Sequence, residues 1–457
     1  MEKREKLSSR LGFIMLSAGC AIGLGNVWRF PFIAGQYGGA LFVLLYLLFL
    51  CIFGIPIMTM EFSVGRASQR SVATSFNILE PKGTKWHLFS WVGMAGNYLL
   101  MMFYTTVAGW ILYYLFYMAS GSFVDITAEA SATIFVNHTG SAVKSVLGMV
   151  MICALGFGIC TIGLQKGVEK ITKWMMSSLF AVMLVLVARA VTLPGAAEGL
   201  RFYLMPSLDA VRQHGLWTVI YAAMGQSFFT LSLGVGSMAI FGSYIGKEHR
   251  LMGESVNVTI LDTMVAFMSG LIIFPACFAF GVKPDAGPSL IFITLPSVFN
   301  EMPLGRLWGI LFFIFMLFAA LSTVIAVFEN IMAFAMDKLG WTRKKSALIN
   351  AAALILLSVP CALGFNLWSG FQPMGPGSNL LDLEDFIVSN NLLPLGSLAY
   401  LLFCVGKNGW GWENFLAEAN SGKGLSFPRQ IKPYLQYGVP VILIAIFIFG
   451  YVEKFFS

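Results

Sequence analysis

Charge is scarce in this chain of 457 residues. Only 11% of the residues are Asp, Glu, Lys or Arg, whereas 58% are hydrophobic. Soluble domains carry about 25% charged residues, so the shortage excludes an ordinary soluble protein. The formal charge of +7 does not indicate nucleic-acid binding, because membrane proteins gather Lys and Arg in their cytoplasmic loops. The composition predicts a polytopic membrane protein.

Metal-binding patterns and paired cysteines are also lacking. The four histidines lie in loops or at expected helix ends without metal-ligand spacing, and the seven cysteines form no C-x-x-C pair. Cysteines scattered through apolar segments behave as small buried hydrophobes. No cleavable signal peptide is expected, because residues 1–10 are polar and the apolar run behind them continues into the glycine-containing stretch described below. We do not expect an enzyme.

Apolar runs long enough to cross a membrane occur about eleven times. A helix needs about 20 residues to span the hydrocarbon core. The runs lie near 11–35, 39–65, 88–118, 145–163, 171–193, 216–245, 251–281, 304–336, 346–363, 384–405 and 433–452. The expected fold class is therefore an all-α integral membrane protein.

Basic residues fall mainly on one side of these runs. If the amino terminus is cytoplasmic, 21 of the 29 Lys and Arg lie in inner segments, 7 lie outside, and Arg29 lies within the membrane. This bias follows the positive-inside rule. We expect a multi-pass protein of the plasma (inner) membrane with a cytoplasmic amino terminus.

The first apolar run contains residues that a continuous membrane helix avoids. From Ser17 to Pro31 it reads S-A-G-C-A-I-G-L-G-N-V-W-R-F-P, with three glycines, Asn26 and Arg29. A glycine costs about 1 kcal/mol in a helix, and an intramembrane arginine costs about 2.5–3.5 kcal/mol on insertion scales. A bilayer tolerates broken backbone only where it lines a protected cavity. The stretch therefore predicts a helix interrupted at mid-membrane, with its loose ends facing a ligand.

The sixth run is interrupted in the same way. Residues 226–237 read Q-S-F-F-T-L-S-L-G-V-G-S, and they open the second set of five helices as the first break opens the first set. Two broken helices at corresponding positions predict a secondary transporter built from inverted repeats. Close helix packing through small residues would explain the glycines but not Asn26, Arg29, Thr230 and Asp262 at membrane depth. We expect a cytoplasmic segment 1–10, repeats 11–193 and 194–410, and a final inner loop and helix 411–457.

These motifs carry a family resemblance. G-x-A-I-G-L-G-N-V-W-R-F-P, followed by G-G-A at 38–40 and later by F-F-T-L-S-L-G-x-G, resembles the neurotransmitter:sodium symporters. Their bacterial amino-acid members include LeuT and the tyrosine and tryptophan transporters. The resemblance covers nearly the whole chain and implies a LeuT-like fold with a 5+5 inverted repeat and broken first and sixth helices. It implies sodium-coupled import by alternating access.

The resemblance places a substrate site between the two breaks. The half-helix after Gly23 offers amide donors and a positive dipole end to a carboxylate. By resemblance, the carboxylate is bound by Leu24, Gly25 and Tyr104, and the α-amino group by Ala21, Phe229, Thr230 and Ser232. The side-chain pocket is expected to be lined by Leu100, Val235, Thr323 and Val327, with Phe229 above it.

Gly23 indicates the class of substrate. Monoamine transporters of the family have an aspartate at this position, which pairs with an amine that lacks a carboxylate. Glycine leaves room for the carboxylate of a zwitterion, so we expect a neutral amino acid. Val235 is smaller than the corresponding residue of some relatives, which favours a hydrophobic or aromatic side chain.

Two sodium sites are implied by the resemblance. The first comprises Ala21, Asn26, Thr230 and Asp262, completed by the substrate carboxylate. The second comprises Gly19, Ile22, Ala319, Ser322 and Thr323. Asp262 stands where relatives commonly have asparagine. A chloride supplies negative charge near this site in animal members, and here Asp262 would supply it, so we expect chloride-independent transport.

Two gates follow from the same resemblance. Arg29 and Asp385 match the outer gate pair, and Arg4 and Asp337 match the cytoplasmic pair, with Tyr244 as its supporting tyrosine. The expected partners are thus an amino acid, sodium ions and the lipid bilayer, with no nucleic acid.

The alternatives belong to other classes. A proton-coupled amino-acid permease of the same fold superfamily would need no sodium ligands, whereas this chain keeps both sets. An ion channel would need a continuous polar pore, and the expected repeats and paired gates argue against one.

Overall fold

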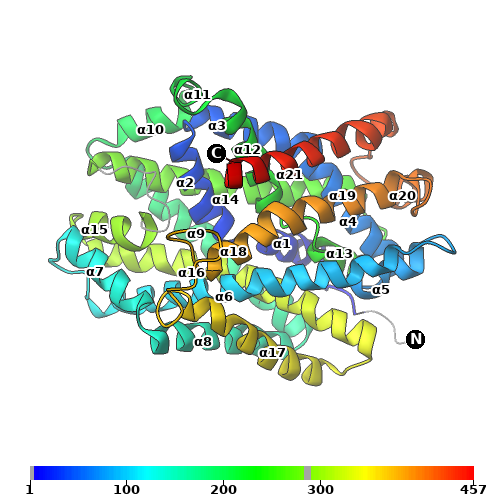
Figure 1. Ribbon diagram of the computed structural model, residues 1–457, viewed down its shortest axis with the longest axis horizontal. Helices are drawn as coiled ribbons and strands as arrows, with labels where there is room; N and C mark the ends of the chain where they lie inside the picture. The colour runs from blue at the N-terminus through cyan, green and yellow to red at the C-terminus, as the bar shows by residue number, and fades with distance from the viewer. Residues whose placement is uncertain (1–4, 282–289, 457) are drawn as a thin grey trace.

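The computed structural model describes residues 5–281 and 290–456, and the regular elements named in this part of the chain are all helices. The only strand-like pairing in it is one isolated bridge between His249 and Lys423. Most of the long helices run roughly along the longest axis of the molecule and pack side by side (Figure 1). Helices that are apolar around their whole circumference are typical of membrane spans.

The segments that correspond to the apolar runs are of two kinds, unbroken helices and pairs of shorter helices. Unbroken helices carry most of them: α6 (Phe89–Ser120), α8 (Ala142–Thr161), α9 (Lys170–Val191), α14 (Leu251–Ala279), α16 (Gly305–Leu339), α17 (Arg343–Leu363) and α21 (Val439–Phe456). Four others are composed of two helices: α1 (Arg10–Ala21) with α2 (Phe30–Gln36), α3 (Ala40–Phe49) with α4 (Ile55–Ser68), α12 (Leu216–Thr230) with α13 (Ser237–Gly242), and α18 (Leu380–Phe386) with α19 (Leu393–Val405).

Short helices close the two ends of this bundle. They are α5 (Val72–Leu79), α7 (Ala128–Thr139), α10 (Ala196–Leu204), α11 (Asp209–His214), α15 (Leu295–Asn300) and α20 (Trp412–Ala419). α7, α10 and α15 gather at the left-hand end of Figure 1, whereas α20 and the chain's amino-terminal end lie at the right. The connections that follow the third and fifth apolar runs, at 119–143 and 194–213, thus contain helices.

Nine helices of the described residues are each long and apolar enough to span a membrane, and the pair α1 and α2, bent by 56°, makes a tenth. The remaining expected span, 216–245, consists of α12 and α13, which are 15 and 6 residues long. Each is shorter than the roughly 20 residues that a continuous span needs. The eleven apolar runs therefore correspond to these ten spans and one strongly divided segment.

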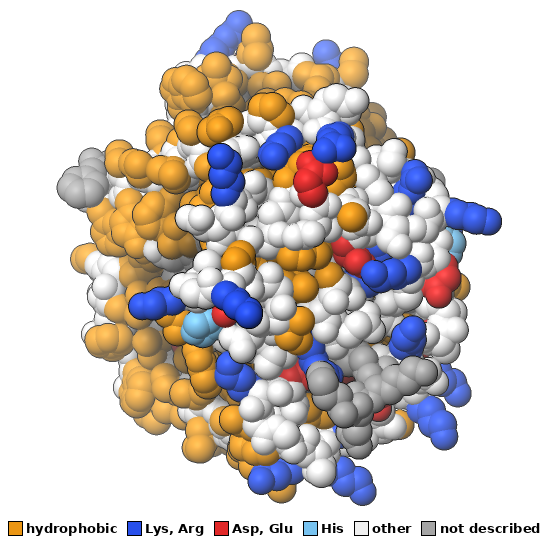
Figure 2. All heavy atoms as spheres, turned by 90° about the vertical axis from the view of Figure 1, so that its right-hand side faces the viewer, with side chains coloured by type: hydrophobic (Ala, Val, Ile, Leu, Met, Phe, Trp, Pro, Cys, Tyr) orange, Lys and Arg blue, Asp and Glu red, His pale blue; other side chains and the backbone are white. Residues whose placement is uncertain are grey.

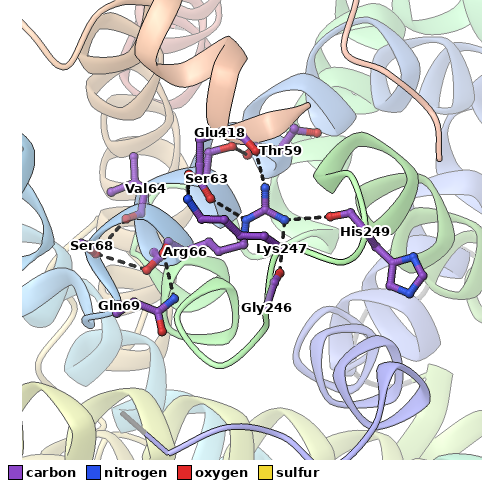
Figure 3. A network of polar contacts seen from close by, with 11 residues as sticks. Thr59, Ser63, Val64, Arg66, Ser68, Gln69, Gly246, Lys247, His249 and Glu418 are labelled. Atoms are coloured by element: carbon purple, nitrogen blue, oxygen red, sulfur yellow. Dashed lines mark hydrogen bonds and ion pairs between the residues drawn. The ribbon is translucent and has the colours of Figure 1, made fainter. Parts of the chain in front are cut away.

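The end of the molecule that carries the amino-terminal segment is rich in basic side chains (Figure 2). Lys247, Lys407 and Lys423 are exposed in connections between helices, and Lys344 and Lys345 are exposed in the first turn of α17. A buried ion cluster lies beneath this surface (Figure 3). Arg66 of α4 donates from Nε to Glu418 Oε1 of α20 at 2.6 Å and from Nη1 to the His249 carbonyl at 2.7 Å.

Candidate functional site

The first break lies between α1 and α2. α1 ends at Ala21, and Ile22 takes an extended conformation (φ −70°, ψ 104°). A wide, π-type turn at Gly25–Arg29 then leads into α2, where Pro31 stands in the first turn. Proline fits there because the first helical turn needs no amide donor from it. The break is therefore short, and it leaves the carbonyls at the end of α1 without their helical partners.

Hydroxyl groups of α16 meet these carbonyls. Thr323 Oγ1 donates to the carbonyls of Gly19 at 3.2 Å and Ile22 at 3.1 Å. Ser322 Oγ lies 2.9 Å from the Ala319 carbonyl and 3.4 Å from that of Ile22. The five residues expected for the second sodium site are thus brought together, and all are buried. Such a set of carbonyl and hydroxyl oxygens suits a hard monovalent cation.

The second break separates α12 from α13 by six residues, 231–236. Ser232, Gly234 and Gly236 in it have positive φ angles of 51°, 92° and 78°. A positive φ is uncommon for a residue with a side chain, so Ser232 is held there by its surroundings. Glu61 of α4 is part of them, because its carboxylate accepts from the Gly234 amide at 2.5 Å.

A polar cluster joins the two breaks to α14. Asn26 Nδ2 donates to Asp262 Oδ1 at 2.8 Å and to Thr230 Oγ1 at 3.1 Å, and Thr230 Oγ1 donates to Asp262 Oδ2 at 2.9 Å. Tyr46 lies 3.4 Å from the same carboxylate. Asp262, Asn26 and Tyr46 are fully buried. A buried carboxylate needs such partners, and a cation is a further partner that this cluster can accept.

The side-chain amide of Asn26 is not oriented as the expected sodium site requires. Its nitrogen points to Asp262, whereas its oxygen accepts from the Gly23 amide at 3.1 Å. A hard cation such as sodium is bound by oxygen atoms. Binding a cation here therefore requires the amide to rotate by half a turn, which frees the Gly23 amide.

A small cavity of about 20 Å³ lies between the breaks. Nine of the twelve expected substrate contacts line it together with one further residue, Leu393: Ala21, Gly23, Leu24, Gly25, Leu100, Tyr104, Phe229, Ser232 and Thr323. A space of this size holds about one water molecule. Residues that line the cavity must therefore move before a molecule as large as the expected amino acid could enter.

Two of the polar groups in the cavity already form a hydrogen bond with each other. The Tyr104 hydroxyl accepts from the Leu24 amide at 3.0 Å, so an incoming carboxylate would replace one of these contacts. A Cβ atom on Gly23 would lie 2.4 Å from the Tyr104 hydroxyl and 2.6 Å from Thr323 Oγ1. This position leaves no room for a side chain of the protein itself.

Three expected contacts do not line the cavity. Val235 is buried with its side chain toward Gly96 of α6, Val327 is buried within α16, and Thr230 belongs to the polar cluster. The turn at Ser232 and Gly234 directs residue 235 away from the cavity, which spacing along the sequence does not reveal. Leu393, from the start of α19, is the lining residue that the sequence reasoning missed.

The outer side of the cavity is closed by an ion pair above an aromatic ring. Arg29 Nη1 lies 3.4 Å from Asp385 Oδ1 and 3.2 Å from Ser389 Oγ. The guanidinium carbon of Arg29 lies 4.3 Å from the centre of the Phe229 ring, a cation–π geometry. Arg29 and Asp385, expected as a pair, are thus brought together.

The expected inner pair of Arg4 and Asp337 stays a prediction, and the structure shows other polar contacts around Tyr244 and Asp337. Tyr244 donates to Glu329 Oε1 at 2.8 Å, and Glu329 also pairs with Arg343 at 2.8 Å. Asp337 accepts from the Ser71 amide at 2.8 Å and lies 3.7 Å from Arg70. Arg4 lies outside the described residues.

Glu329 and Arg343 were thus missed by the sequence reasoning. Glu329 is an acid inside the eighth apolar run, which is the same signal that singled out Asp262. Its partner Arg343 stands 14 residues further along, beyond the end of α16.

Comparisons with known proteins identify similar chains. A family model described as the sodium:neurotransmitter symporter family matches residues 4–127 and 131–454. The uncharacterized sodium-dependent transporter YhdH of Bacillus subtilis (strain 168) is 34% identical over 449 residues, covering 98% of each chain. An uncharacterized sodium-dependent transporter of Haemophilus influenzae is 32% identical over 460 residues, again covering 98% of each chain.

A solved structure is similar over the same length. The crystal structure of MhsT in complex with L-phenylalanine matches with a TM-score of 0.88 and 37% sequence identity, covering 98% of this chain and 99% of that one.

Proposed function

The chain belongs to the sodium:neurotransmitter symporter family, and we propose that it imports a neutral amino acid with a hydrophobic or aromatic side chain, without chloride. Membership confirms the expected family, the LeuT-like membrane fold and sodium-dependent transport, and it argues against the proton-coupled permease. The substrate, the two sodium sites, the gates and the chloride independence are our proposals.

The observation that carries the substrate class is the space at Gly23. Only a residue without a side chain fits between Tyr104 and Thr323, and the next two amides, of Leu24 and Gly25, line the same cavity. These donors at the start of a half-helix suit a carboxylate. The substrate brings that carboxylate itself, so it is an amino acid.

The apolar part of the cavity indicates the substrate side chain. Leu100, Phe229 and Leu393 form its apolar walls, and such walls favour hydrophobic or aromatic groups. The similar protein MhsT was crystallised with L-phenylalanine, which supports the same class here.

Sodium binds at two places in this proposal. One ion takes oxygens from Ala21, Asn26, Thr230 and Asp262, and the other takes oxygens from Gly19, Ile22, Ala319, Ser322 and Thr323. At about 2.3 kcal/mol per charge for 100 mV and about 1.4 kcal/mol for a tenfold gradient, two ions supply roughly 7 kcal/mol. That free energy supports about a 10⁵-fold gradient of a neutral zwitterion.

Asp262 supports transport without chloride. It is a fully buried carboxylate whose hydrogen-bond partners are neutral groups, namely Asn26, Thr230 and Tyr46. Its charge is therefore available to balance a sodium ion, so no second anion is needed.

The orientation in the membrane follows from the basic residues. The end of the molecule shown in Figure 2 is rich in Lys and Arg, which supports a cytoplasmic amino terminus in the plasma (inner) membrane. Access alternates as the first two helices of each repeat, 11–193 and 194–410, rock against the others.

Thermal unfolding of the purified protein across the twenty amino acids tests the proposal. In sodium we expect large apolar amino acids to raise the melting temperature, and in potassium we expect no shift. Replacing chloride with gluconate should leave the shift unchanged.

Asp262→Asn keeps the shape of the side chain but removes its charge, so the half-saturating sodium concentration of this variant should rise about tenfold. If no amino acid shows sodium-dependent binding, the proposal is overturned. A strict requirement for chloride would overturn the part of the proposal that concerns chloride.

A further inference from the structure

Asn97, in the first third of α6, is a fully buried polar residue that the proposed mechanism does not use. Its Nδ2 donates to the carbonyls of Gly93 at 2.7 Å and Val235 at 2.8 Å. Its Oδ1 accepts from Asn330 Nδ2 at 3.0 Å and from Ser237 Oγ at 3.2 Å. An amide side chain has two donors and room for two acceptor contacts, and Asn97 uses them all.

These four bonds divide into two kinds. The bonds to Gly93 and Asn330 stay within α6 and between α6 and α16, which both belong to the helices that stay fixed in the proposed rocking motion. The bonds to Val235 and Ser237 cross to the second broken helix, which belongs to the moving set. Asn97 is therefore shared between the fixed and moving parts.

The backbone geometry brings the two parts close at this point. A Cβ atom on Gly93 would lie 3.3 Å from the Val235 carbonyl oxygen, and one on Gly96 would lie 2.7 Å from Val235 Cγ1. These glycines let α6 approach the unwound segment closely enough for a short amide side chain to reach it. Asn97, Val235 and Ser237 are all buried, so their hydrogen bonds form in surroundings of low dielectric constant, where such bonds are strengthened.

Glu61 gives a useful contrast. It also binds the unwound segment, through the Gly234 amide, but it stands on α4, in the same moving set as that segment. Its bond can persist through the whole cycle. The bonds of Asn97 to Val235 and Ser237 cannot persist if α13 withdraws from α6.

We infer that Asn97 is a positioning residue that latches the inner half of the second broken helix to the fixed helices while the inner side is closed. The inference rests on the proposed function, because alternating access defines the two sets. When α13 moves away, Asn97 keeps its bonds to Gly93 and Asn330. The side chain thus stays oriented, and the bonds to Val235 and Ser237 re-form on return.

Hydrogen exchange of the protein in lipid nanodiscs tests this latch. In sodium-free buffer, Asn97→Ala should raise the exchange rate of the amides of residues 237–242 about tenfold, because two bonds of ordinary strength that hold the closed state are lost. The half-saturating sodium concentration should rise by a similar factor, since the competent state is less populated.

Asn350→Ala is the matched control. Asn350 is also a buried asparagine, and it accepts from Tyr98 of α6 at 2.5 Å, but it stands on α17, so this bond joins two fixed helices. We expect its loss to lower the melting temperature without changing exchange at 237–242. Ser237→Ala removes one crossing bond only and should give a smaller rise, with little further change when combined with Asn97→Ala.

Equal exchange at 237–242 in Asn97→Ala and Asn350→Ala would overturn the latch, as would an unchanged rate in Ser237→Ala. The exchange comparison needs no amino acid or sodium. A failure of the proposed substrate would instead appear as a lack of sodium-dependent thermal shifts in the unaltered protein, so the two failures are distinguishable.

Discussion

The two broken helices differ in what holds their loose backbone. At the first break, the carbonyls of Gly19 and Ile22 contact hydroxyls of α16, and the Leu24 amide contacts the Tyr104 hydroxyl. Small neutral groups of this kind can exchange partners with an ion or a carboxylate.

At the second break, the Gly234 amide is bound by the Glu61 carboxylate and the Val235 carbonyl by the Asn97 amide. Gly396 of α19 also packs directly on Gly234, because a Cβ atom there would lie 1.9 Å from the Gly234 carbonyl oxygen. The first break is thus built to bind, and the second is built to keep its shape. Four substitutions test this difference.

The largest effect is expected at Gly23. Gly23→Ala places a methyl group against Tyr104 and Thr323, at the position proposed for the substrate carboxylate. We expect about a hundredfold loss of amino-acid affinity, as for a ligand group that is displaced and leaves buried donors unpaired. The measurement is sodium-dependent ligand binding by thermal shift. Gly225→Ala is the control, since nothing lies within 4 Å of a Cβ there.

Glu61→Ala should act on stability instead. The Gly234 amide is left buried without a partner, which costs about 1–3 kcal/mol of unfolding free energy. Melting temperatures without ligand report this loss, and Glu301→Ala, an exposed acid, should leave them unchanged. If Glu61→Ala melts normally but binds sodium poorly, the second break is itself a binding element and the contrast fails.

Thr323→Val should raise the half-saturating sodium concentration about tenfold, because one hydroxyl ligand is lost. Thr323→Ser retains the hydroxyl and serves as the control, with nearly unchanged sodium affinity. Titration of the thermal shift with sodium gives both values. An unchanged sodium affinity in Thr323→Val would place the ion elsewhere.

The smallest effect is expected at the outer gate. Arg29 and Asp385 are about one third exposed, at 29% and 35%, and partly exposed ion pairs contribute about 0.2–1 kcal/mol. Asp385→Asn should therefore speed release of bound substrate only about two- to fivefold. Asp209→Asn, which breaks the exposed pair with Arg212, should not change the release rate. If Asp385→Asn releases bound substrate more slowly than the unaltered protein, the proposed role of this pair as a gate is contradicted.

The sequence was informative where a residue conflicts with its surroundings. Asn26, Arg29, Thr230 and Asp262 stand out in apolar runs, and the structure brings Asn26, Thr230 and Asp262 into one cluster. The same conflict marked Glu329, which was overlooked because its partner Arg343 lies beyond the helix end.

Other features have no local sequence signal. Leu393 reaches the cavity because the wide turn at Ile387–Leu392 rotates α19 relative to α18. Val235 leaves the cavity because Ser232 and Gly234 take positive φ angles. In both cases a backbone irregularity changes which side chains share a face, and regular spacing cannot anticipate it.

The near-absence of free space in the cavity sets a lower size limit for the substrate. With only about 20 Å³ open, the residues that line the cavity, Phe229 and Leu393 among them, must move apart before a molecule of several atoms can enter, and this movement costs free energy. A long apolar side chain recovers this cost by filling the widened space, whereas glycine or alanine leaves a void behind. If the proposed function holds, we expect small amino acids to bind weakly because they are too small to keep the site open, without any group that repels them.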